Sequence, residues 1–380
     1  MRILYVASDQ HVPGSTGGSV HVLEVARGLA ARGHEVHAVV HAKDGLPREE
    51  QREGVHWHRI RWSPDHSYFR FRASGAVEDV AASVRPQVLM ERYYNFGGEG
   101  ITVAHRLRIP SMLEVNSPVL DHPGSLKGAL DALLLVRPLR RRRERLCREA
   151  TAIVSPLVEI VPEFARPKTE RVSWGANVDA FQPASDRRQQ TRQRLGIPPD
   201  AVVVLFSGSF RPWHGVPVLE AAARRLHDRR DVFFLLVGGT AAADGDGYRG
   251  RRLGPVPYET MPEVVAAADI GVAPYDTAKL GQLRLGFYWS PLKIFEYMAC
   301  GLPTVTVPRF PLTEIVRDGE EGRHVREADA ADLARVLGEL ADRPDERCRL
   351  GESARRRVVE SYSWAAHCRQ LEAILTRMAS

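Results

Sequence analysis

The sequence predicts an α/β protein made of two doubly wound parallel sheets in series. Short β-branched runs alternate with stretches of helical apolar spacing, which is the pattern of βαβ units. This pattern starts a second time after the polar, turn-rich segment 177–190. With 380 residues, 44% of them hydrophobic and 26% charged, the chain has room for two cores of ordinary globular composition.

Nine apolar runs predict the strands of these sheets, and the helical stretches fall between them. In the first half, strands are expected over 2–8, 35–41, 87–92, 110–115 and 150–155, and a helix over 19–32. In the second half, strands are expected over 201–208, 232–239, 268–275 and 304–308, and helices over 218–226, 259–268 and 291–299. Because doubly wound sheets bind ligands at the carboxyl ends of their strands, two such sheets predict a ligand cleft between two domains.

Composition excludes several classes of protein. The net charge of +6 comes from 53 basic and 47 acidic side chains, an excess too small to indicate a nucleic-acid partner without a concentrated patch. The four cysteines are far apart and lack the spacing of a disulfide framework or a zinc site. The N-terminal segment lacks the zones of a signal peptide, and no apolar run has the length of a membrane span, so a cytoplasmic location is expected.

A glycine-rich loop in the first half is a candidate anion site. Gly17 and Gly18 precede the helix start expected at Ser19, where backbone N–H groups are free to meet an anion. The spacing is not G-x-G-x-x-G, and no acid follows at the expected place on the next strand, so no nicotinamide cofactor is expected. A plain tight turn accounts for the two glycines equally well.

The stretch SPLKIFEYMACG in the second half predicts a second anion site. Ser290 and Pro291 are typical of an N-cap and a first helical residue. Lys293 then falls in a first turn, where the helix dipole disfavours a cation unless an anion such as a diphosphate shares the free amides. Glu296, on the same helix face, could accept hydrogen bonds from a ribose diol. The alternative is a local ion pair between Lys293 and Glu296, which the apolar run around them disfavours.

Two further basic residues, Arg211 and His214, follow a strand and precede a helix, which places them at the same sheet edge as Lys293.

Six segments of the chain carry a family resemblance. The segments that carry it are the GG loop at 17–18, WGANVDAFQP, GSFRPWHGV, AAADIGVAPY, SPLKIFEYMACGLPTV and YSWAAHCRQLEAIL. In this order they resemble the retaining glycosyltransferases of family four, which have the GT-B fold, over nearly the whole chain.

The resemblance implies an N-terminal Rossmann-like acceptor domain over 1–180 and a C-terminal Rossmann-like donor domain over 181–361, facing across a cleft. A last helix over 362–380 would pack back on the first domain. It further implies transfer of a sugar, with retention, from a nucleoside-diphosphate sugar, UDP or GDP above all, to a hydroxyl of a glycan, a lipid-linked glycan or a natural product. The leaving phosphate would act as the base, so no metal and no cofactor are expected.

Site residues follow from the same resemblance and from their positions in the sequence. Residues expected to act in catalysis are Arg211, Lys293 and Glu296. Residues expected to bind the donor are Gly17, Gly18, Ser209, His214, Val256, Pro291 and Leu292. Residues expected near the acceptor are Arg92, Glu114 and Asn116, with core packing as the alternative for Arg92 and a buried loop cap as the alternative for the other two.

Three departures from the family pattern leave questions open. Tyr288 stands where the family has the first glutamate of a pair, which leaves the donor sugar undetermined. Ser209 and His214 align with the usual arginine and lysine phosphate clamp, and a histidine there makes phosphate contact pH-dependent. Glu114 and Asn116 occupy the region of the family's acceptor histidine.

Two other functions and one further surface stay open. A GT-B relative that isomerises or phosphorolyses a sugar would use the same phosphate site, and a protein that binds a nucleotide without transfer would also keep it. The arginine run Arg140–Arg143, with Arg145, follows the apolar stretch ALDALLLV and is a candidate for peripheral contact with an anionic membrane. A solvated helix face is the alternative for this run.

Overall fold

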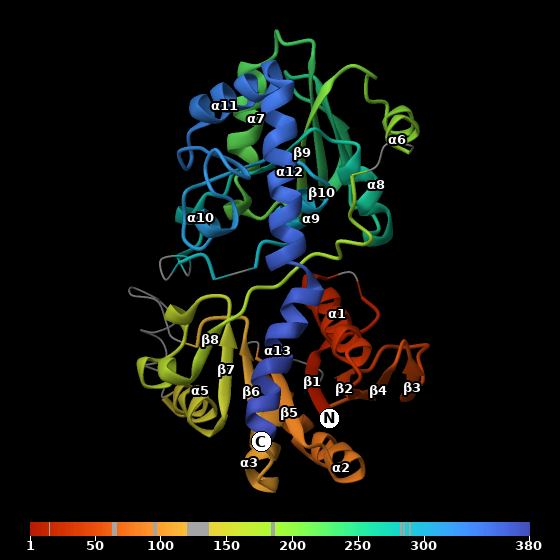
Figure 1. Cartoon of the computed structure of the whole chain (residues 1–380), viewed down its shortest axis with the longest axis vertical. Helices are drawn as coiled ribbons and strands as arrows, with labels where there is room; N and C mark the ends of the chain where they lie inside the picture. The colour runs from red at the N-terminus through yellow and green to blue at the C-terminus, as the bar shows by residue number, and fades with distance from the viewer. Residues whose placement is uncertain are drawn as a thin grey trace. The chain divides into compact units, whose positions relative to one another are not determined.

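The computed structural model describes residues 1–14, 16–62, 67–93, 97–119, 137–183, 187–281, 283, 286–288 and 290–380, which form two compact units (Figure 1). Unit 1 comprises Met1–Trp174, Tyr288–Ser290 and Trp364–Ser380. Unit 2 comprises Gly175–Phe287 and Pro291–Ser363. The domain boundaries were expected after residues 180 and 361, and the two units divide instead after Trp174 and Ser363.

Unit 1 is built on an eight-stranded sheet of order β3-β4-β2-β1-β5-β6-β7-β8. Its strands are β1 (Arg2–His11), β2 (Glu35–His41), β3 (Glu49–Arg52), β4 (Val55–Ile60), β5 (Val88–Tyr93), β6 (Ser111–Val115), β7 (Ala152–Ser155) and β8 (Thr169–Arg171). All neighbours pair in parallel except β3 and β4. Central strands β5 and β6 are buried at every residue, as expected where helices cover both faces of a parallel sheet.

Helices pack around this sheet. They are α1 (Gly17–Ala31), α2 (Ser74–Val84), α3 (Glu99–Leu107), α5 (Arg137–Glu149) and α13 (Trp364–Ala379), with 3₁₀ turns η1 (Ser67–Ala73), η2 (Val158–Ile160) and η3 (Glu163–Lys168). The last helix of the chain, α13, lies against α1 of the same unit. Gly28 of α1 allows this approach, because a Cβ at that position would overlap the Cys368 sulfur.

Unit 2 is built on a six-stranded parallel sheet of order β11-β10-β9-β12-β13-β14. Its strands are β9 (Val202–Gly208), β10 (Val232–Asp244), β11 (Gly250–Gly254), β12 (Ile270–Ala273), β13 (Thr304–Thr306) and β14 (Gly322–His324). Its helices are α6 (Arg188–Arg194), α7 (Val216–Arg225), α8 (Met261–Ala266), α9 (Leu292–Ala299), α10 (Leu312–Ile315), α11 (Ala330–Asp342) and α12 (Pro344–Ser361), with η4 (Pro212–His214), η5 (Tyr258–Thr260) and η6 (Thr277–Lys279). The prediction of two parallel α/β sheets is confirmed.

All nine predicted strands are present, with ends that differ by a few residues. Within the described part of the chain, no helix combines the length and the apolar character that crossing a bilayer requires.

Candidate functional site

The candidate site of unit 2 lies where the end of β9 meets the start of α9. β9 ends at Gly208, whose φ of 150° is one that L side chains rarely adopt. A Cβ built on Gly208 would lie 2.7 Å from Lys293 Nζ and 3.3 Å from His214 Nδ1. Glycine at this position therefore allows the Lys293 and His214 side chains to approach the backbone at the carboxyl end of a central strand. Parallel sheets bind ligands at this end of their strands.

Lys293 brings a buried ammonium group to this point. Its Nζ is shielded from solvent and has no hydrogen-bond partner among the described residues. Instead it lies 4.2 Å from the centre of the Phe206 ring and 5.6 Å from that of Tyr275. Burial lowers the pKa of Lys293 from its usual value to about 7, although the charge of Glu296 opposes the shift. A buried ammonium group that contacts aromatic rings but makes no hydrogen bond has unused donor capacity, which an anionic ligand would satisfy.

His214 faces the same point with a second unsatisfied nitrogen. Its Nδ1 is buried and lacks a hydrogen-bond partner in the described structure. Burial, together with the charges of Lys293 and Arg211, lowers the pKa of His214 to about 3, so the imidazole is neutral at pH 7. Arg211, which immediately precedes η4, is exposed.

Glu296 lies one turn further along α9 and is also buried. Burial raises the pKa of Glu296 to about 7, and a hydrogen bond with the Tyr258 side chain and the charge of Lys293 oppose the rise. Since the Lys293 ammonium has no hydrogen-bonded partner in the described structure, the two side chains do not form the local ion pair considered above.

The start of α9 differs from the prediction. Ser290 does not cap the helix, because its Oγ accepts a hydrogen bond from the Trp174 backbone N–H at 3.0 Å. Pro291 occupies the cap position without a side-chain hydrogen bond, and the helix begins at Leu292. Lys293 is still in the first turn, which contains no acidic residue. The free amides and the dipole of that turn thus remain next to the lysine.

In unit 1 the glycine-rich segment is helical earlier than expected. α1 begins at Gly17 rather than at Ser19, and Thr16 caps it by accepting a hydrogen bond from Ser19 N at 3.2 Å. A Cβ on Gly18 would overlap the Gln10 side chain and lie 3.0 Å from Arg92 Nη2. Close packing against Gln10 and Arg92 therefore explains why position 18 is a glycine, whether or not a ligand also binds there.

The three residues expected near the acceptor have partners within unit 1. Arg92 donates to Asp9 Oδ2 at 2.6 Å. Asn116 Oδ1 accepts from Trp174 Nε1 at 3.1 Å. These two side chains are nearly buried, yet both belong to segments at the carboxyl ends of neighbouring strands, β5 and β6.

Glu114 belongs to a buried cluster with His21 of α1 and His367 of α13. Its Oε1 lies 2.7 Å from His21 Nε2, and its Oε2 accepts from Tyr5 OH at 3.2 Å. Burial raises the pKa of Glu114, but the charge and hydrogen bond of His21 outweigh it and lower the pKa to about 2.

The same cluster has the composition of a metal site but not its spacing. One ligand atom from each of the two histidines and the glutamate lies within 4.8 Å of the others. Two ligands of a tetrahedral zinc ion lie about 3.3 Å apart, given bonds of roughly 2.0 Å. His21 Nε2 and Glu114 Oε1 lie only 2.7 Å apart, closer than two ligands of one zinc ion, so the structure shows a direct contact between imidazole and carboxylate.

The remaining predicted donor residues of unit 2 follow strand ends or precede Lys293 in the sequence. Ser209 is exposed just after β9, Val256 is half-buried after β11, and Pro291 and Leu292 precede Lys293 at the start of α9. Tyr288, which replaces the family glutamate, is buried and belongs to unit 1.

Sequence reasoning missed three residues that shape this site. Phe206 and Tyr275 supply the ring faces against Lys293, and Gly208 makes room for it. The signal for Gly208 was available, since a glycine at the end of a buried strand often marks a close backbone approach. The sequence did not single out Phe206, because an aromatic residue of a buried strand cannot be told from an ordinary core residue by its type alone.

Comparisons with known proteins agree with this architecture. A family model described as "Glycosyl transferases group 1" matches residues 201–343, and one described as "Glycosyl transferase 4-like domain" matches residues 16–172, so together they match most of the chain. A D-inositol 3-phosphate glycosyltransferase of Streptomyces scabiei is 29% identical over 94% of this chain and 86% of its own length.

Solved structures show the same fold at low identity. Sucrose-phosphate synthase from Thermosynechococcus elongatus superposes with a TM-score of 0.77 at 19% identity, covering 99% of this chain and 98% of that one. The Anabaena protein Alr3699/HepE in complex with UDP-glucose superposes with a TM-score of 0.69 at 15% identity, covering 99% and 100%. Two parallel α/β units, two matching family models and these relatives together lead to one conclusion: the chain belongs to the group 1 glycosyltransferases and has the GT-B fold.

Proposed function

We propose that unit 2 binds the diphosphate of a nucleoside-diphosphate sugar at Lys293 and that the enzyme transfers the sugar with retention of configuration, as enzymes of family four do. The observation that carries the proposal is the pair of buried, unpartnered nitrogens, Lys293 Nζ and His214 Nδ1, that face the strand-end glycine Gly208. The Lys293 ammonium and the free amides of the α9 first turn would neutralise a diphosphate, and the neutral His214 would donate a hydrogen bond to it from Nδ1.

The donor-binding residues have separate roles in this proposal. Lys293 and Arg211 supply positive charge to the diphosphate as the bond to the sugar breaks, which stabilises the departing group. Glu296 accepts hydrogen bonds from the ribose hydroxyls, and backbone groups around Val256 contact the base. Because protein cations and helix amides neutralise the leaving group, the proposed reaction is metal-independent and uses no cofactor.

The acceptor is proposed to bind in unit 1, near Arg92, Glu114 and Asn116, while Gly17 and Gly18 contact the donor diphosphate. The reacting group of the acceptor is a hydroxyl, and the leaving phosphate of the donor takes its proton. The curated relative from Streptomyces scabiei is named for an inositol phosphate, and the Anabaena structure contains UDP-glucose. We would therefore test UDP-sugars first as donors. Cyclitol phosphates would be tested as acceptors beside glycans and lipid-linked glycans.

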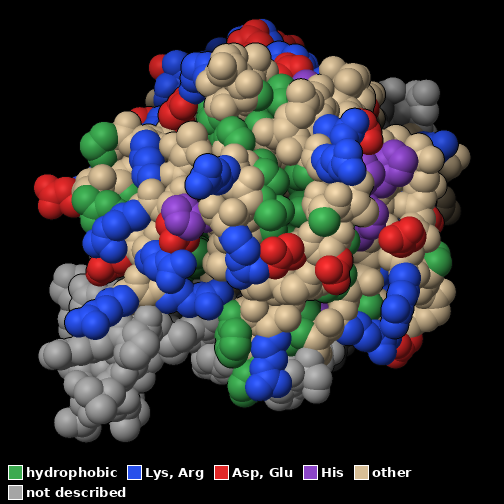
Figure 2. Space-filling model, turned by 90° about the horizontal axis from the view of Figure 1, so that it is seen from below, with side chains coloured by type: hydrophobic (Ala, Val, Ile, Leu, Met, Phe, Trp, Pro, Cys, Tyr) green, Lys and Arg blue, Asp and Glu red, His purple; other side chains and the backbone are tan. Residues whose placement is uncertain are grey.

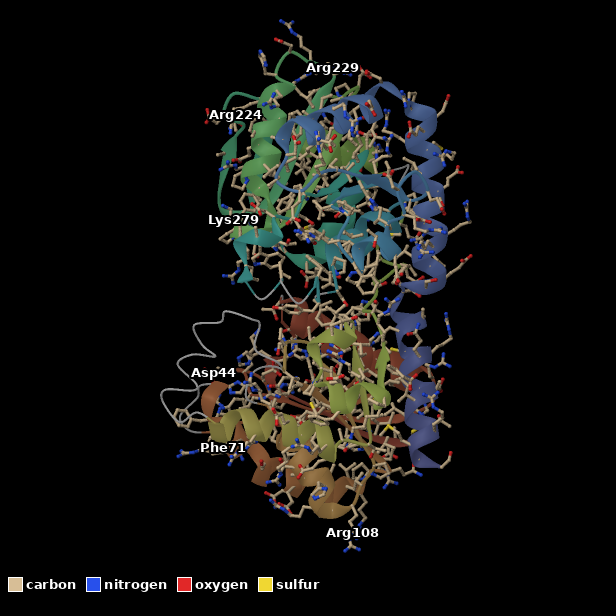
Figure 3. All side chains as sticks on the ribbon, turned by 90° about the vertical axis from the view of Figure 1, so that its left-hand side faces the viewer. Asp44, Phe71, Arg108, Arg224, Arg229 and Lys279 are labelled. Atoms are coloured by element: carbon tan, nitrogen blue, oxygen red, sulfur yellow. The ribbon has the colours of Figure 1, made fainter. Side chains whose placement is uncertain are left out.

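The test is a thermal-shift panel with UDP, GDP, ADP and dTDP and their sugar conjugates. Wild type would be compared with Lys293→Met, Glu296→Gln and the control Lys279→Met, which removes an exposed lysine of the same unit (Figure 3). A ligand at a hundred times its Kd adds about 2.7 kcal/mol of stability. We expect one nucleotide to stabilise wild type and Lys279→Met, and to have much less effect on the other two variants.

Two results would contradict this function. If no nucleotide shifts the transition, or if Lys293→Met responds as wild type does, the anion site is misplaced. If a nucleotide sugar binds at Lys293 but neither transfer nor slow hydrolysis follows, the chain is a nucleotide-binding protein without transfer activity. A product in which free phosphate or an isomerised sugar replaces the glycoside would favour a GT-B phosphorylase or isomerase.

A further inference from the structure

Helix α5 carries an unusual concentration of charge. Over Arg137–Glu149 it contains seven arginines and two glutamates, a net charge of +5, whereas the whole chain has a net charge of only +6. The rest of the protein is therefore close to neutral, and the basic excess that sequence composition alone left unplaced lies on one helix of unit 1. Such a local field acts on partners far more strongly than the average charge does.

The exposed face of α5 is a stripe of arginines. Leu146 and Cys147 are buried against the unit, while Arg141, Arg145 and Arg148 are exposed and follow one another at intervals of four and three residues. Residues at this spacing share one helix face. In Figure 2, Lys and Arg side chains gather on the left-hand side, the side on which α5 lies in Figure 1.

Acidic neighbours only partly neutralise the stripe. Glu149 accepts from Arg145 Nε at 2.6 Å, and Glu144 lies 3.7 Å from Arg148. The side chains of these two arginines remain 63% and 59% exposed, so their guanidinium groups can still bind a second anion. The side chain of Arg140, at the start of the predicted basic run, lies outside the described ones.

Exposed aromatic rings lie beside two arginines of α5, Arg142 next to the stripe and Arg148 within it. Phe71 of η1 is 42% exposed and lies 5.7 Å below the Arg142 guanidinium, at the margin of the unit (Figure 3). Phe164 of η3 is 46% exposed and lies 4.5 Å below that of Arg148. Both are among the few large apolar side chains in the described structure that are this exposed.

We propose that Phe71, Arg141, Arg145, Arg148 and Phe164, here named the α5 patch, dock the enzyme on an anionic lipid surface. Arginines in a row bind lipid phosphates, and aromatic side chains beside them enter the boundary between headgroups and acyl chains. Exposed rings set next to the cations favour a membrane over a purely polar anionic partner such as duplex nucleic acid. The patch is separate from the donor residues of unit 2, so this inference does not depend on the proposed function.

The experiment is flotation of the full chain with vesicles of phosphatidylcholine, with and without phosphatidylglycerol. The test variant combines Arg141→Gln, Arg145→Gln and Arg148→Gln. The matched control combines Arg224→Gln, Arg225→Gln and Arg230→Gln, which removes the same charge from exposed positions of unit 2. Figure 3 labels Arg224. A second variant, Phe71→Ser with Phe164→Ser, removes the rings and keeps the charge.

We expect wild type to bind only the vesicles that contain phosphatidylglycerol. The α5 charge variant should lose roughly 100-fold in partition coefficient, because each basic residue near an anionic surface contributes about fivefold. The control variant should change little, and the ring variant should bind several-fold more weakly with an unchanged salt dependence, because its charge is unchanged. Circular dichroism and urea denaturation show that each variant is folded.

Three outcomes would overturn the proposal. One is absence of binding to the anionic vesicles. Another is an equal loss in the α5 charge variant and in the control, which would indicate a response to net charge alone. The third is binding of an RNA oligonucleotide at concentrations where vesicles are not bound.

Discussion

At the scale of single residues, the central feature is a lysine whose charge depends on its surroundings. Lys293 is buried among ring faces and free amides, and burial lowers its pKa to about 7. Burial also raises the pKa of Glu296, one turn away, to about 7. A diphosphate beside Lys293 would stabilise the ammonium, and a ribose diol donating to Glu296 would stabilise the carboxylate. Donor binding should therefore move protons at both residues.

The direction of this proton transfer should reverse with pH. At pH 8 free Lys293 is mostly neutral and Glu296 mostly ionised, so binding takes up a proton at the lysine. At pH 6 the lysine is already charged and the glutamate protonated, so binding releases a proton from Glu296. Calorimetry in two buffers of different ionisation enthalpy measures the change, which approaches about one proton per ligand at each extreme. A nucleotide sugar is the suitable ligand, since its diphosphate does not titrate in this range.

Two variants separate these contributions. Lys293→Met should abolish uptake at pH 8 and keep release at pH 6, whereas Glu296→Gln should do the reverse. Proton exchange of the same sign at both pH values, or uptake that persists without Lys293, would contradict the assignment of these two groups.

At the scale of elements, strands were more predictable than helix starts. Buried parallel strands are continuous apolar runs, so β2 and β9 could be read from residue type alone. Ser290 looked like an N-cap, but its hydroxyl binds the distant backbone of Trp174, a tertiary contact that local sequence does not encode. β4, with polar residues at alternate positions in VHWHRI, lacks the run and was not predicted.

The contact between α1 and α13 is an element-scale feature that can be tested by size. Gly28 lies under Cys368, whose sulfur would overlap an added Cβ and lies 3.8 Å from the Val25 carbonyl oxygen. Gly28→Ala should therefore lower the free energy of unfolding by about 1–3 kcal/mol through overpacking, despite the better helix propensity of alanine. Urea denaturation measures the change.

A size-compensating variant checks the cause. Gly28→Ala combined with Cys368→Ala should recover a large part of the loss, since the second change removes the atom that the first one meets. Additive losses in a double-mutant cycle would show that the two helices adjust independently of this contact.

At the scale of the whole molecule, the two-sheet architecture could be predicted from the sequence, and so could the position of Lys293 in the first turn of a helix. The sequence did not predict which side chains surround that lysine, because Phe206, Tyr275 and Gly208 are brought to it by tertiary folding. Nor did it predict the cluster that joins Glu114 to residues near both ends of the chain. Patterns reveal elements and motifs, whereas contacts between elements distant in sequence become visible only in the fold.

That cluster should make unit 1 the acid-sensitive part of the molecule. His367 is buried and donates from Nδ1 to the Ser173 carbonyl oxygen at 2.8 Å. Burial, aided by the charge of His21, lowers its pKa to about 4. Between this value and its usual one near 6.5, the unfolded chain binds a proton that the folded chain does not, so stability falls as pH falls through this range. Glu114, with its lowered pKa, adds a second loss of stability only below about pH 4.5.

Urea denaturation followed by tryptophan fluorescence at pH 7 and pH 5 tests the contribution of His367. Its shift predicts a loss of about 2 kcal/mol over this interval in wild type. His367→Gln should be less stable at pH 7 but should lose correspondingly less on acidification, because glutamine does not titrate. His227→Gln, which removes an exposed histidine of unit 2, should keep the wild-type pH dependence. If both variants lose as much stability as wild type does, acid sensitivity originates outside the buried cluster, and the docking of α13 on unit 1 is indifferent to protonation.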